Sequence, residues 1–328
     1  MEYRLLGKTG IQVSAISLGT WQVGGKWGSE FDHNNADKIL NQAVDAGVNF
    51  IDTADVYSDG ESEKAVGRLV RSRKEKIHVA TKCGRQLQPH VNQSYQVDVL
   101  RKFVEDSLRN MQLETIDLVQ LHCPPTEVYY RPEIFDLFSQ LKQEGKIQNM
   151  GVSVEKVEEG LKALEYENVT TVQVIFNMFR QRPANLFFEQ ALEKNVGIIV
   201  RVPLASGLLT GKFGPETSFA AGDHRQFNRS GEAFDKGETF SGIDYETGLA
   251  AVAALKEIFP GQSNLAAIAL RWILQFKAVS CIIPGASSPE QVLQNIHVFD
   301  QPELTAEELA AINRVYDQFI KPAVHHLW

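Results

Sequence analysis

Four ionisable side chains stand where they could act together on one reacting group. Asp52, Lys82 and His122 each follow a run of apolar, largely β-branched or aromatic residues, and Tyr57 comes five residues after Asp52. Such runs predict buried strands. An ionisable group at the tip of a buried strand, or on the loop after it, favours a functional site over a purely structural role. We therefore interpret these residues as one catalytic set.

These residue types suit the reduction of a carbonyl group. A tyrosine hydroxyl has an ordinary pKa of about 10, so it donates its proton poorly at neutral pH unless a cation such as Lys82 lowers that value. Asp52 is expected to hold Lys82 charged and in place. His122 is expected to orient the carbonyl oxygen toward Tyr57 and to stabilise the developing negative charge. The reaction then needs a hydride besides the proton.

Each of these residues also has an ordinary structural explanation when it is taken alone. An aspartate before a threonine most often caps a turn, and a lysine at a strand end is usually solvated. Tyr57 and His122 would most often be packed residues that donate a hydrogen bond. Their occurrence at successive strand ends favours a joint site.

The elements expected around these residues alternate between strand and helix. A short hairpin, 3–6 with 11–13, comes first. Apolar runs predict strands over 15–18, 48–51, 77–81, 116–121, 147–152, 171–176, 197–200 and 279–283. Helical periodicity predicts helices over 35–46, 61–70, 132–143, 155–165, 185–194, 247–258, 265–276 and 289–298. Two further helices are expected to open at Asp98 and at the capping box of Thr305 and Glu308.

This alternation predicts an α/β fold, a (β/α)8 TIM barrel. Strands separated by helices imply a parallel sheet, and about eight such units in 328 residues indicate a closed barrel. The whole chain, 1–328, is then expected to be a single domain. An open doubly wound sheet is the alternative, but the G-x-G-x-x-G turn that usually accompanies it is missing from the sequence.

One segment breaks the alternation. Residues 203–245, after the seventh strand, are polar and contain several glycines, and they are too long for an ordinary connection. We predict that this segment is a lid over a ligand. The last residues, His325 to Trp328, could bind a metal or close the pocket, but we expect them to form a mobile tail.

Composition excludes several classes of partner. The formal charge of −8 disfavours nucleic acid and anionic membranes, which need basic surfaces. No apolar run approaches bilayer length, and the N-terminus lacks the apolar region of a signal peptide. Cys83, Cys123 and Cys281 form no C-x-x-C pair, which indicates a reducing compartment, by default the cytoplasm. The mechanism needs no metal.

The motifs that carry the four residues resemble those of the aldo-keto reductase superfamily, in particular its branch of bacterial stress-type oxidoreductases. They are D-T-A-x-x-Y at 52–57, A-T-K at 80–82, and Leu121-His122. Further matches are Leu18-Gly19-Thr20, Gly60-x-Ser62-Glu63, Gly151-Val152-Ser153, Gln173 with Asn177, 207–212, and Ile283-Pro284-Gly285. The resemblance covers nearly the whole chain. It implies an NAD(P)H-dependent enzyme that reduces aldehydes or ketones to alcohols, with Tyr57 as the proton donor.

The resemblance also implies where a nicotinamide cofactor, usually NADPH, would bind. Ser153 and Gln173 would hold the carboxamide, 203–212 would wrap the pyrophosphate, and 285–295 would take the adenosine end. The implied cofactor contacts are Gly19, Thr20, Trp21, Ser153, Gln173, Arg201, Pro203, Leu204, Ser206, Gly207, Leu209, Lys212, Gly285, Ser287, Gln291, Gln294 and Asn295. Trp21 is equally well read as lining the substrate mouth or as covering the barrel rim.

Three departures from the family pattern concern the cofactor. Val154 follows Ser153 where the family commonly has asparagine, and Arg201 stands where an aromatic ring often stacks on the nicotinamide. Stacking on the nicotinamide would then come from the guanidinium plane of Arg201 or be absent. Residues 285–291 contain no lysine or arginine for a 2′-phosphate. NADH therefore stays open beside NADPH, and Arg225 or Arg229 of the lid could supply the missing cation.

Two other functions remain as alternatives on this sequence. One is a regulatory module that keeps the cofactor as a redox sensor and turns over little. The other is a class I aldolase with Lys82 as the Schiff-base residue, although Asp52 should keep that lysine protonated. The partner expected in the main reading is a small carbonyl compound, whose identity the sequence leaves open together with the choice between monomer and homo-oligomer.

Overall fold

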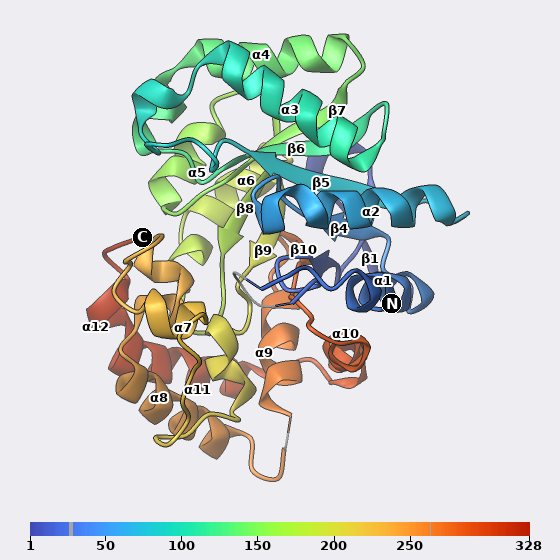
Figure 1. Cartoon of the computed structure of the whole chain (residues 1–328). Coiled ribbons are helices and arrows are strands. Elements are labelled where there is room, and N and C mark those ends of the chain that lie inside the picture. The colour runs from blue at the N-terminus through green and yellow to red at the C-terminus, as the bar shows by residue number, and fades with distance from the viewer. Residues whose placement is uncertain (26–28, 263) are drawn as a thin grey trace.

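Parallel strands form the centre of the molecule. The computed structural model describes residues 1–25, 29–262 and 264–328, and within these ranges one sheet runs in chain order from β3 to β10 (Figure 1). Its strands are β3 Leu18–Gly19, β4 Phe50–Asp52, β5 His78–Cys83, β6 Ile116–His122, β7 Ile147–Ser153, β8 Val169–Ile175, β9 Gly197–Arg201 and β10 Val279–Ile282. Every neighbouring pair is parallel.

The two edges of this sheet meet, so the sheet closes into a barrel. Parallel bridges join Ile16 to Ile282 and Gly19 to Gly285, and the Ser17 amide donates to the Ile282 carbonyl at 2.8 Å. The predicted (β/α)8 barrel is thereby confirmed. The first strand of the barrel, β3, is shorter than the predicted strand 15–18. Ile16, before it, pairs with the last strand through an isolated bridge and not through a continuous ladder.

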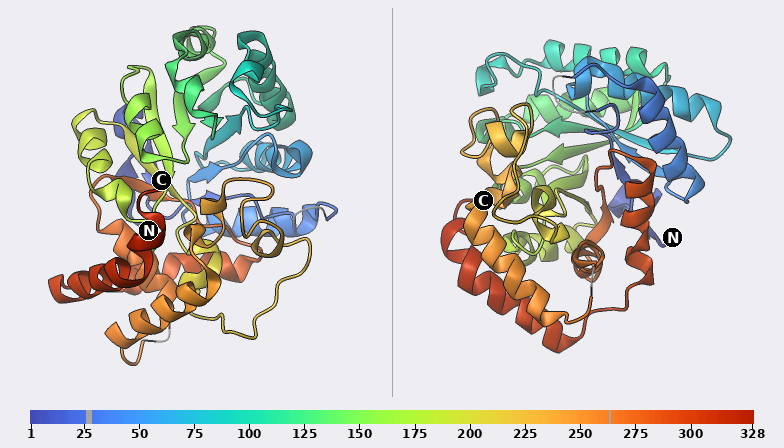
Figure 2. Two further views of the ribbon diagram at one scale, coloured as in Figure 1. Left: turned by 90° about the vertical axis from the view of Figure 1, so that its left-hand side faces the viewer. Right: turned by 60° about the horizontal axis from the view of Figure 1, so that its bottom comes forward.

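Helices surround the strands (Figure 2). They are α1 His33–Asp45, α2 Glu61–Ser72, α3 Val97–Met111, α4 Pro132–Gln143, α5 Val157–Ala163, α6 Phe187–Glu193, α8 Tyr245–Ile258, α9 Leu265–Leu274, α10 Pro289–Ile296, α11 Ala306–Val315 and α12 Lys321–Val324. The amphipathic stripe of α3 is its buried face, formed by Leu100, Val104, Ser107 and Met111. None of the helices in the described ranges is both long and apolar enough to cross a bilayer.

Two expectations about helix starts had different outcomes. The capping box at Thr305 and Glu308 is present and opens α11, as predicted. The prediction that Asp98 caps α3 is wrong, because Gln96 is the N-cap residue and Asp98 lies inside the first turn. An acidic residue is still favourable there, since it faces the positive end of the helix dipole.

The inside of the barrel is filled by alternate residues of the strands. β1 Tyr3–Leu5 pairs antiparallel with β2 Gln12–Ser14, which confirms the N-terminal hairpin. Side chains of this hairpin region and of the strands form one buried cluster: Leu6, Ile11, Val13, Phe50, Ala80, Leu118, Ile199, Cys281 and Ile283. Because side chains alternate along a strand, the residues two positions later also point inward. These are Asp52, Lys82 and Gln120, so the apolar core passes directly into a polar layer.

The segment 203–245 has more structure than a loop. It contains the short helical turns η6 Ala205–Thr210, α7 His224–Phe227, η7 Lys236–Glu238 and η8 Phe240–Gly242. It follows β9, the seventh strand of the barrel, as predicted. We call this segment the lid.

The prediction of a mobile C-terminal tail is wrong. Only 6% of Trp328 is exposed, and the Arg180 guanidinium lies 4.1 Å from its ring centre. The ring covers Gly237 and Gly242 of the lid, where an added Cβ would lie 2.9 Å and 2.7 Å from ring atoms. The tail is therefore packed against the lid and the barrel, near α7 in Figure 1, because the indole finds an apolar, cation-lined site there.

We predict that Gly67→Ala lowers the free energy of unfolding by about 1–3 kcal/mol, since overpacking a tight contact costs that much. Gly67 lies where α2 meets α3, and a Cβ there would lie 2.7 Å from the Met111 carbonyl carbon and closer still to its oxygen. Urea denaturation measures the change. Gly214→Ala is the control, because a Cβ at Gly214 meets no described atom within 4 Å. An equal loss in that variant would contradict the α2–α3 explanation.

Candidate active site

The structure brings the four sequence-predicted residues together at the C-terminal end of the barrel. Asp52, Lys82 and His122 lie at the ends of β4, β5 and β6, and Tyr57 opens the turn η2 Tyr57–Gly60. The Lys82 ammonium donates to Asp52 Oδ1, to the Thr53 carbonyl at 2.8 Å and to the Tyr57 hydroxyl at 3.3 Å. The rings of Tyr57 and His122 meet edge to face, with centres 5.9 Å apart. A carbonyl oxygen could thus approach both side chains.

The Asp52 carboxylate is held from two sides. While Oδ1 accepts from Lys82, Oδ2 accepts from Gln120 Nε2 at 3.0 Å and from Gln173 Nε2 at 2.8 Å. Gln120 was missed in the sequence reading, although it lies two positions before His122 and therefore on the same inward face. The two amides fix the direction in which Asp52 presents its charge to Lys82.

Charges in this buried layer compensate one another. Burial lowers the pKa of Lys82, but the Asp52 carboxylate and the nearby Tyr57 raise it more, so that the net shift is upward. Lys82 is therefore an ammonium at neutral pH, as the sequence predicted. This also disfavours its use as a Schiff-base nucleophile.

Tyr57 differs from expectation. Burial raises the pKa of its hydroxyl, and although Lys82 opposes this, the net direction is upward. The prediction that Lys82 lowers the pKa of Tyr57 below its ordinary value is wrong for the protein without cofactor. Burial destabilises the phenolate by more free energy than the Lys82 ammonium stabilises it. Tyr57 consequently keeps its proton throughout the neutral range, and Lys82 prevents a larger shift.

His122 is a neutral imidazole. Burial depresses its pKa well below the usual value, and the positive charges of Arg85, Lys82 and Arg201 depress it further. Its Nδ1 atom is buried and has no hydrogen-bond partner among the described residues. A neutral ring can donate an N–H bond to a carbonyl oxygen without supplying a proton of its own.

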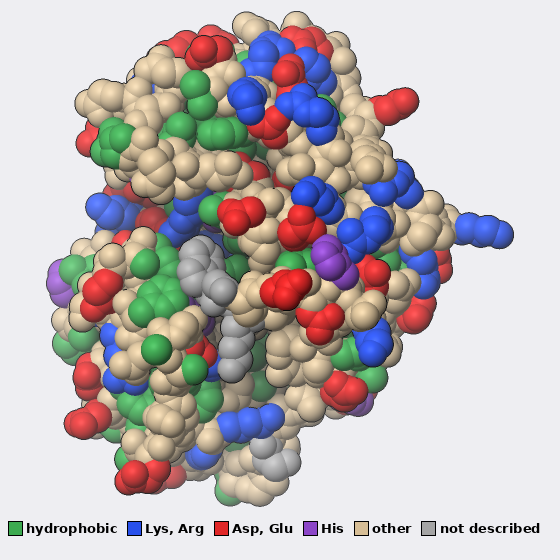
Figure 3. Space-filling model, viewed as in Figure 1, with side chains coloured by type: hydrophobic (Ala, Val, Ile, Leu, Met, Phe, Trp, Pro, Cys, Tyr) green, Lys and Arg blue, Asp and Glu red, His purple; other side chains and the backbone are tan. Residues whose placement is uncertain are grey.

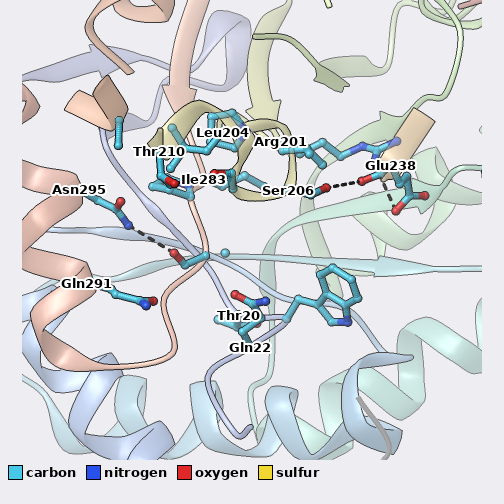
Figure 4. A pocket seen from close by; sticks show the side chains of 18 of the residues that line it. Thr20, Gln22, Arg201, Leu204, Ser206, Thr210, Glu238, Ile283, Gln291 and Asn295 are labelled. Carbon is cyan, nitrogen blue, oxygen red and sulfur yellow. Dashed lines mark hydrogen bonds and ion pairs between the residues drawn. The ribbon is translucent and has the colours of Figure 1, made fainter. Parts of the chain in front are cut away.

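A cavity of about 660 Å³ opens above these residues. Asp52, Tyr57 and His122 line it, and so do parts of the lid and of α10. Figure 4 shows Gln291 and Asn295 on the α10 side and Arg201, Ser206 and Glu238 on the lid side. The cavity therefore extends from Asp52, Tyr57 and His122 to α10, and its walls come from the barrel, the lid, α10 and the start of α9.

Most residues that the family resemblance assigned to a cofactor line this cavity. They are Gly19, Thr20, Trp21, Gln173, Arg201, Pro203, Leu204, Ser206, Gly207, Lys212, Gly285, Gln291, Gln294 and Asn295. Three others lie off it: Ser153 and Leu209 are fully buried, and the exposed Ser287 donates its amide and hydroxyl to Gln291 Oε1. Ser153 lies behind the cavity wall, 3.4 Å from Cys123 Sγ.

Two more lining residues belong to predicted features: Thr210 lies in the segment 203–212, and Arg225 was a candidate cation for a 2′-phosphate. The other lining residues were not predicted as contacts, and they are Gln22, Val202, Phe213, His224, Glu238, Asn264, Ala266, Ile283 and Pro284. Val202, Ile283 and Pro284 could have been found as neighbours of predicted contacts. His224, Glu238 and Asn264 belong to no motif, because folding of the lid and of α9 alone brings them to the cavity.

Trp21 and Arg201 have defined places in the cavity wall. Trp21 packs against two lid residues, with its ring centre 4.9 Å from that of His224 and 6.3 Å from that of Phe234. Arg201 Nη2 donates to the Val154 carbonyl at 3.1 Å and to Glu155 Oε2 at 3.0 Å. Trp21 thus bridges the barrel rim and the lid, and Arg201 is fixed in one orientation.

The lining fits an extended nicotinamide cofactor. His122 Nδ1 and Arg201 Nε are buried without a partner among the described residues, which leaves them available to a bound group. Lys212 lines the cavity beside the lid backbone, and a lysine suits a pyrophosphate. The amides of Gln291, Gln294 and Asn295 stand at the α10 end, where donors and acceptors for an adenosine are needed.

A parallel barrel that gathers aspartate, tyrosine, lysine and histidine under an elongated cavity defines a class of barrel oxidoreductases. Residues 15–317 match the model of the Aldo/keto reductase family, and the chain belongs to that family. It is an oxidoreductase that reduces aldehydes or ketones with a nicotinamide cofactor.

Individual relatives agree with this assignment over nearly their full lengths. The aldo-keto reductase YhdN of Bacillus subtilis is 28% identical over 99% of this chain and 96% of its own. The structure of the glycerol dehydrogenase AKR11B4 from Gluconobacter oxydans is 31% identical, with a TM-score of 0.78 over 97% of this chain and 96% of that one. The NADH-specific methylglyoxal reductase of Escherichia coli is 27% identical over 89% and 91%.

Asp55, between Asp52 and Tyr57 in the same motif, has a buried side chain. Both of its carboxylate oxygens lack a hydrogen bond among the described residues. Burial, and then the neighbouring Glu63, raise the pKa of Asp55 well above its ordinary value. A group whose pKa is raised on folding stabilises the protein below its unfolded pKa, and this contribution is lost as pH rises.

We therefore predict that Asp55→Asn becomes more stable relative to the natural protein as pH rises from about 4. Asparagine keeps the shape but cannot ionise, so the penalty of burying a carboxylate at higher pH disappears. Urea denaturation of both proteins between acidic and mildly alkaline pH measures the difference. Asp59→Asn in the following exposed turn is the matched control. A stability difference for Asp55→Asn that does not change with pH would contradict the burial argument.

Proposed function

We propose that Tyr57 donates the proton in carbonyl reduction, with Lys82, Asp52 and His122 in supporting roles. The observation that carries this proposal is the position of the Lys82 ammonium, which bonds both Asp52 and, at 3.3 Å, the Tyr57 hydroxyl. Tyr57 and His122 line one cavity. A carbonyl oxygen placed between them would accept two hydrogen bonds.

The roles follow from the charges. Tyr57 is protonated at neutral pH, so it can give its proton to the oxygen as negative charge develops there. The Lys82 ammonium then stabilises the phenolate that is left. His122, being neutral, donates a hydrogen bond that orients the carbonyl oxygen without competing as an acid. A reduced nicotinamide, when bound, supplies the hydride.

The cofactor contacts are proposed from the cavity lining. In this proposal Gln173 contacts the carboxamide, Ser206 and Lys212 contact the pyrophosphate, and Gln291 and Asn295 contact the adenosine end. Their presence around one elongated cavity supports this assignment. Ser153 is fully buried and does not line the cavity. It could contact the carboxamide only after a rearrangement of the cavity wall.

The substrate is proposed to be a small aldehyde or ketone, bound by one domain spanning 1–328. The names of two relatives, a methylglyoxal reductase and a glycerol dehydrogenase, support small carbonyl compounds. The charge of −8, and the mixture of acidic and basic side chains on the face seen in Figure 3, support a small molecule over nucleic acid. Three buried free cysteines support a reducing compartment such as the cytoplasm.

Tyr57→Phe tests the main proposal. It removes only the phenolic O–H, so kcat for reduction of a reactive aldehyde should fall by about 10²- to 10⁴-fold. Cofactor affinity should stay within about twofold, because Tyr57 contributes a proton and not a binding contact. The oxidation of NADPH or NADH in steady state measures turnover, and fluorescence titration measures affinity.

Tyr130→Phe is the control for that substitution. Tyr130 is 64% exposed and does not line the cavity, so this variant should keep full turnover. The proposal fails if Tyr57→Phe reduces the aldehyde at the rate of the natural protein. It also fails if neither cofactor supports reduction by the natural protein over a panel of aldehydes, ketoses and inosose-type ketones.

For the cofactor, we propose that NADH and NADPH are both used, with kcat/KM values within about tenfold of each other. The segment 285–295 carries no lysine or arginine for the 2′-phosphate. Arg225 lines the cavity, but its Nε and Nη2 atoms donate to the Asp223 carboxylate, at 2.8 Å and 2.6 Å. Arg229 donates to the Arg225 carbonyl at 2.8 Å. The lid arginines therefore have partners of their own.

Adding a cation to the α10 end should create a preference for NADPH. Gln294→Arg is expected to raise the ratio of kcat/KM for NADPH over NADH by about tenfold, since a guanidinium pairs well with a phosphate. Gln93→Arg, an exposed change away from the cavity lining, should leave the ratio unchanged. A natural protein that already prefers NADPH by a thousandfold would contradict this proposal.

A further inference from the structure

A carboxylate of the lid reaches the barrel beside the catalytic residues. Glu238, in η7, lines the same cavity as Tyr57 and His122. Its Oε1 lies 2.9 Å from Arg85 Nη2, and its Oε2 lies 3.6 Å from Arg201 Nη1. Arg85 follows β5 and Arg201 ends β9. One side chain of the lid therefore joins two separate parts of the barrel rim.

These contacts belong to a balanced set of four charges. Glu155, which follows β7, lies 3.0 Å from Arg201 Nη2 and 3.9 Å from Arg85 Nη1. Two carboxylates thus face two guanidiniums, and all four side chains are at most 20% exposed. Glu155 and Glu238 also lie near Cys123, in a geometry that could hold a metal ion. The two guanidiniums already balance these carboxylates, so we read the set as an ion-pair network.

Removing one member of such a network is unfavourable. Without the Glu238 carboxylate, two guanidiniums would share the single charge of Glu155. A partly buried charge that loses its partner costs more than an exposed pair is worth. Arg85 and Arg201 would then have to turn toward water, and the lid would lose this one of its connections to the rim, while the packing of Trp21 against the lid would remain.

The backbone of Glu238 is tied to the segment proposed to wrap the pyrophosphate. Ser206 Oγ donates to the Glu238 carbonyl at 3.0 Å and accepts from the Phe240 amide at 3.1 Å. In Figure 4, dashed lines join both Ser206 and Arg201 to Glu238. Ala205 and Ser206 have positive φ angles of 47° and 54°, a conformation that needs support from its surroundings. Glu238 supplies part of that support.

The turn η7, which carries Glu238, also packs against the C-terminal tail. Gly237 packs under Trp328, and its amide donates to Asp235 Oδ1 at 2.7 Å. Arg180, which lies over the Trp328 ring, donates to the Glu155 carbonyl at 3.0 Å. The position of Glu238 is consequently set by the tail on one side and by the barrel rim on the other.

We propose that Glu238 is a positioning residue with two roles. It holds segment 203–212 in place against the barrel, and it fixes the side chains at the rim beside the carbonyl site. The carboxylate holds Arg85 and Arg201 at the rim, and its backbone carbonyl holds Ser206. Cofactor retention and carbonyl binding therefore depend on one lid residue. The part concerning the carbonyl rests on the proposed function, whereas the part concerning the lid does not.

Glu238→Gln tests this inference, because glutamine keeps the size and the backbone contact but loses the charge. In the protein without cofactor, trypsin should cleave after the exposed Lys236 about fivefold faster. The dissociation constants of NADPH and NADH, measured by fluorescence titration, should rise about tenfold. The KM for the aldehyde should rise about tenfold while kcat stays within about threefold.

Two further variants make the test specific. Glu216→Gln changes an exposed carboxylate of the same lid and should leave cleavage, affinity and KM unchanged. Arg85→Gln removes the contact from the barrel side, so it should reproduce the effects of Glu238→Gln. The double variant should then be no worse than either single one, because both remove the same interaction.

The inference is overturned if Glu238→Gln shows the cleavage rate and cofactor affinity of the natural protein, or if its effects and those of Arg85→Gln simply add. Failure of the natural protein to reduce any carbonyl would remove the proposed function. It would leave the cleavage and titration results standing, and these decide the role of Glu238 in the lid by themselves.

Discussion

The site depends on one buried ammonium. Lys82 is almost fully buried, and it stays charged because Asp52 accepts from it while Gln120 and Gln173 hold the other carboxylate oxygen. An unpaired ammonium at this depth would lose its proton. The pair makes the inner end of the cavity polar above an apolar barrel core, and it fixes the position of the Tyr57 hydroxyl.

The second constraint lies where the lid meets the barrel rim. Here the lid, the barrel rim and the tail meet around the charges of Arg85, Arg201, Glu155 and Glu238. The inner pair and this outer network both act on His122, whose neutral state follows from burial among positive charges. The chemistry proposed for the site therefore relies on two layers of compensated charge, one formed by the strands and one closed by the lid.

Much of this arrangement could be predicted from residue patterns. Alternating apolar runs and amphipathic stripes indicate a parallel barrel, and in a parallel barrel the strand ends converge, which places Asp52, Lys82 and His122 side by side. The direction of the pKa shift of Tyr57 could not be predicted in this way, because the motif does not tell how deeply the hydroxyl is buried. The N-cap of α3 was also misassigned, since Gln96 caps by its backbone conformation and not by its residue type.

By itself, the sequence determined the family, the barrel and the identity of the four central residues, because these depend on local periodicity and on short motifs. Only the tertiary structure decided which distant residues complete the site. Glu238 and Trp328 belong to no motif, and they reach their places because the lid and the tail fold back over the barrel. Contacts between segments so far apart depend on packing and charge balance in three dimensions, which no local pattern records.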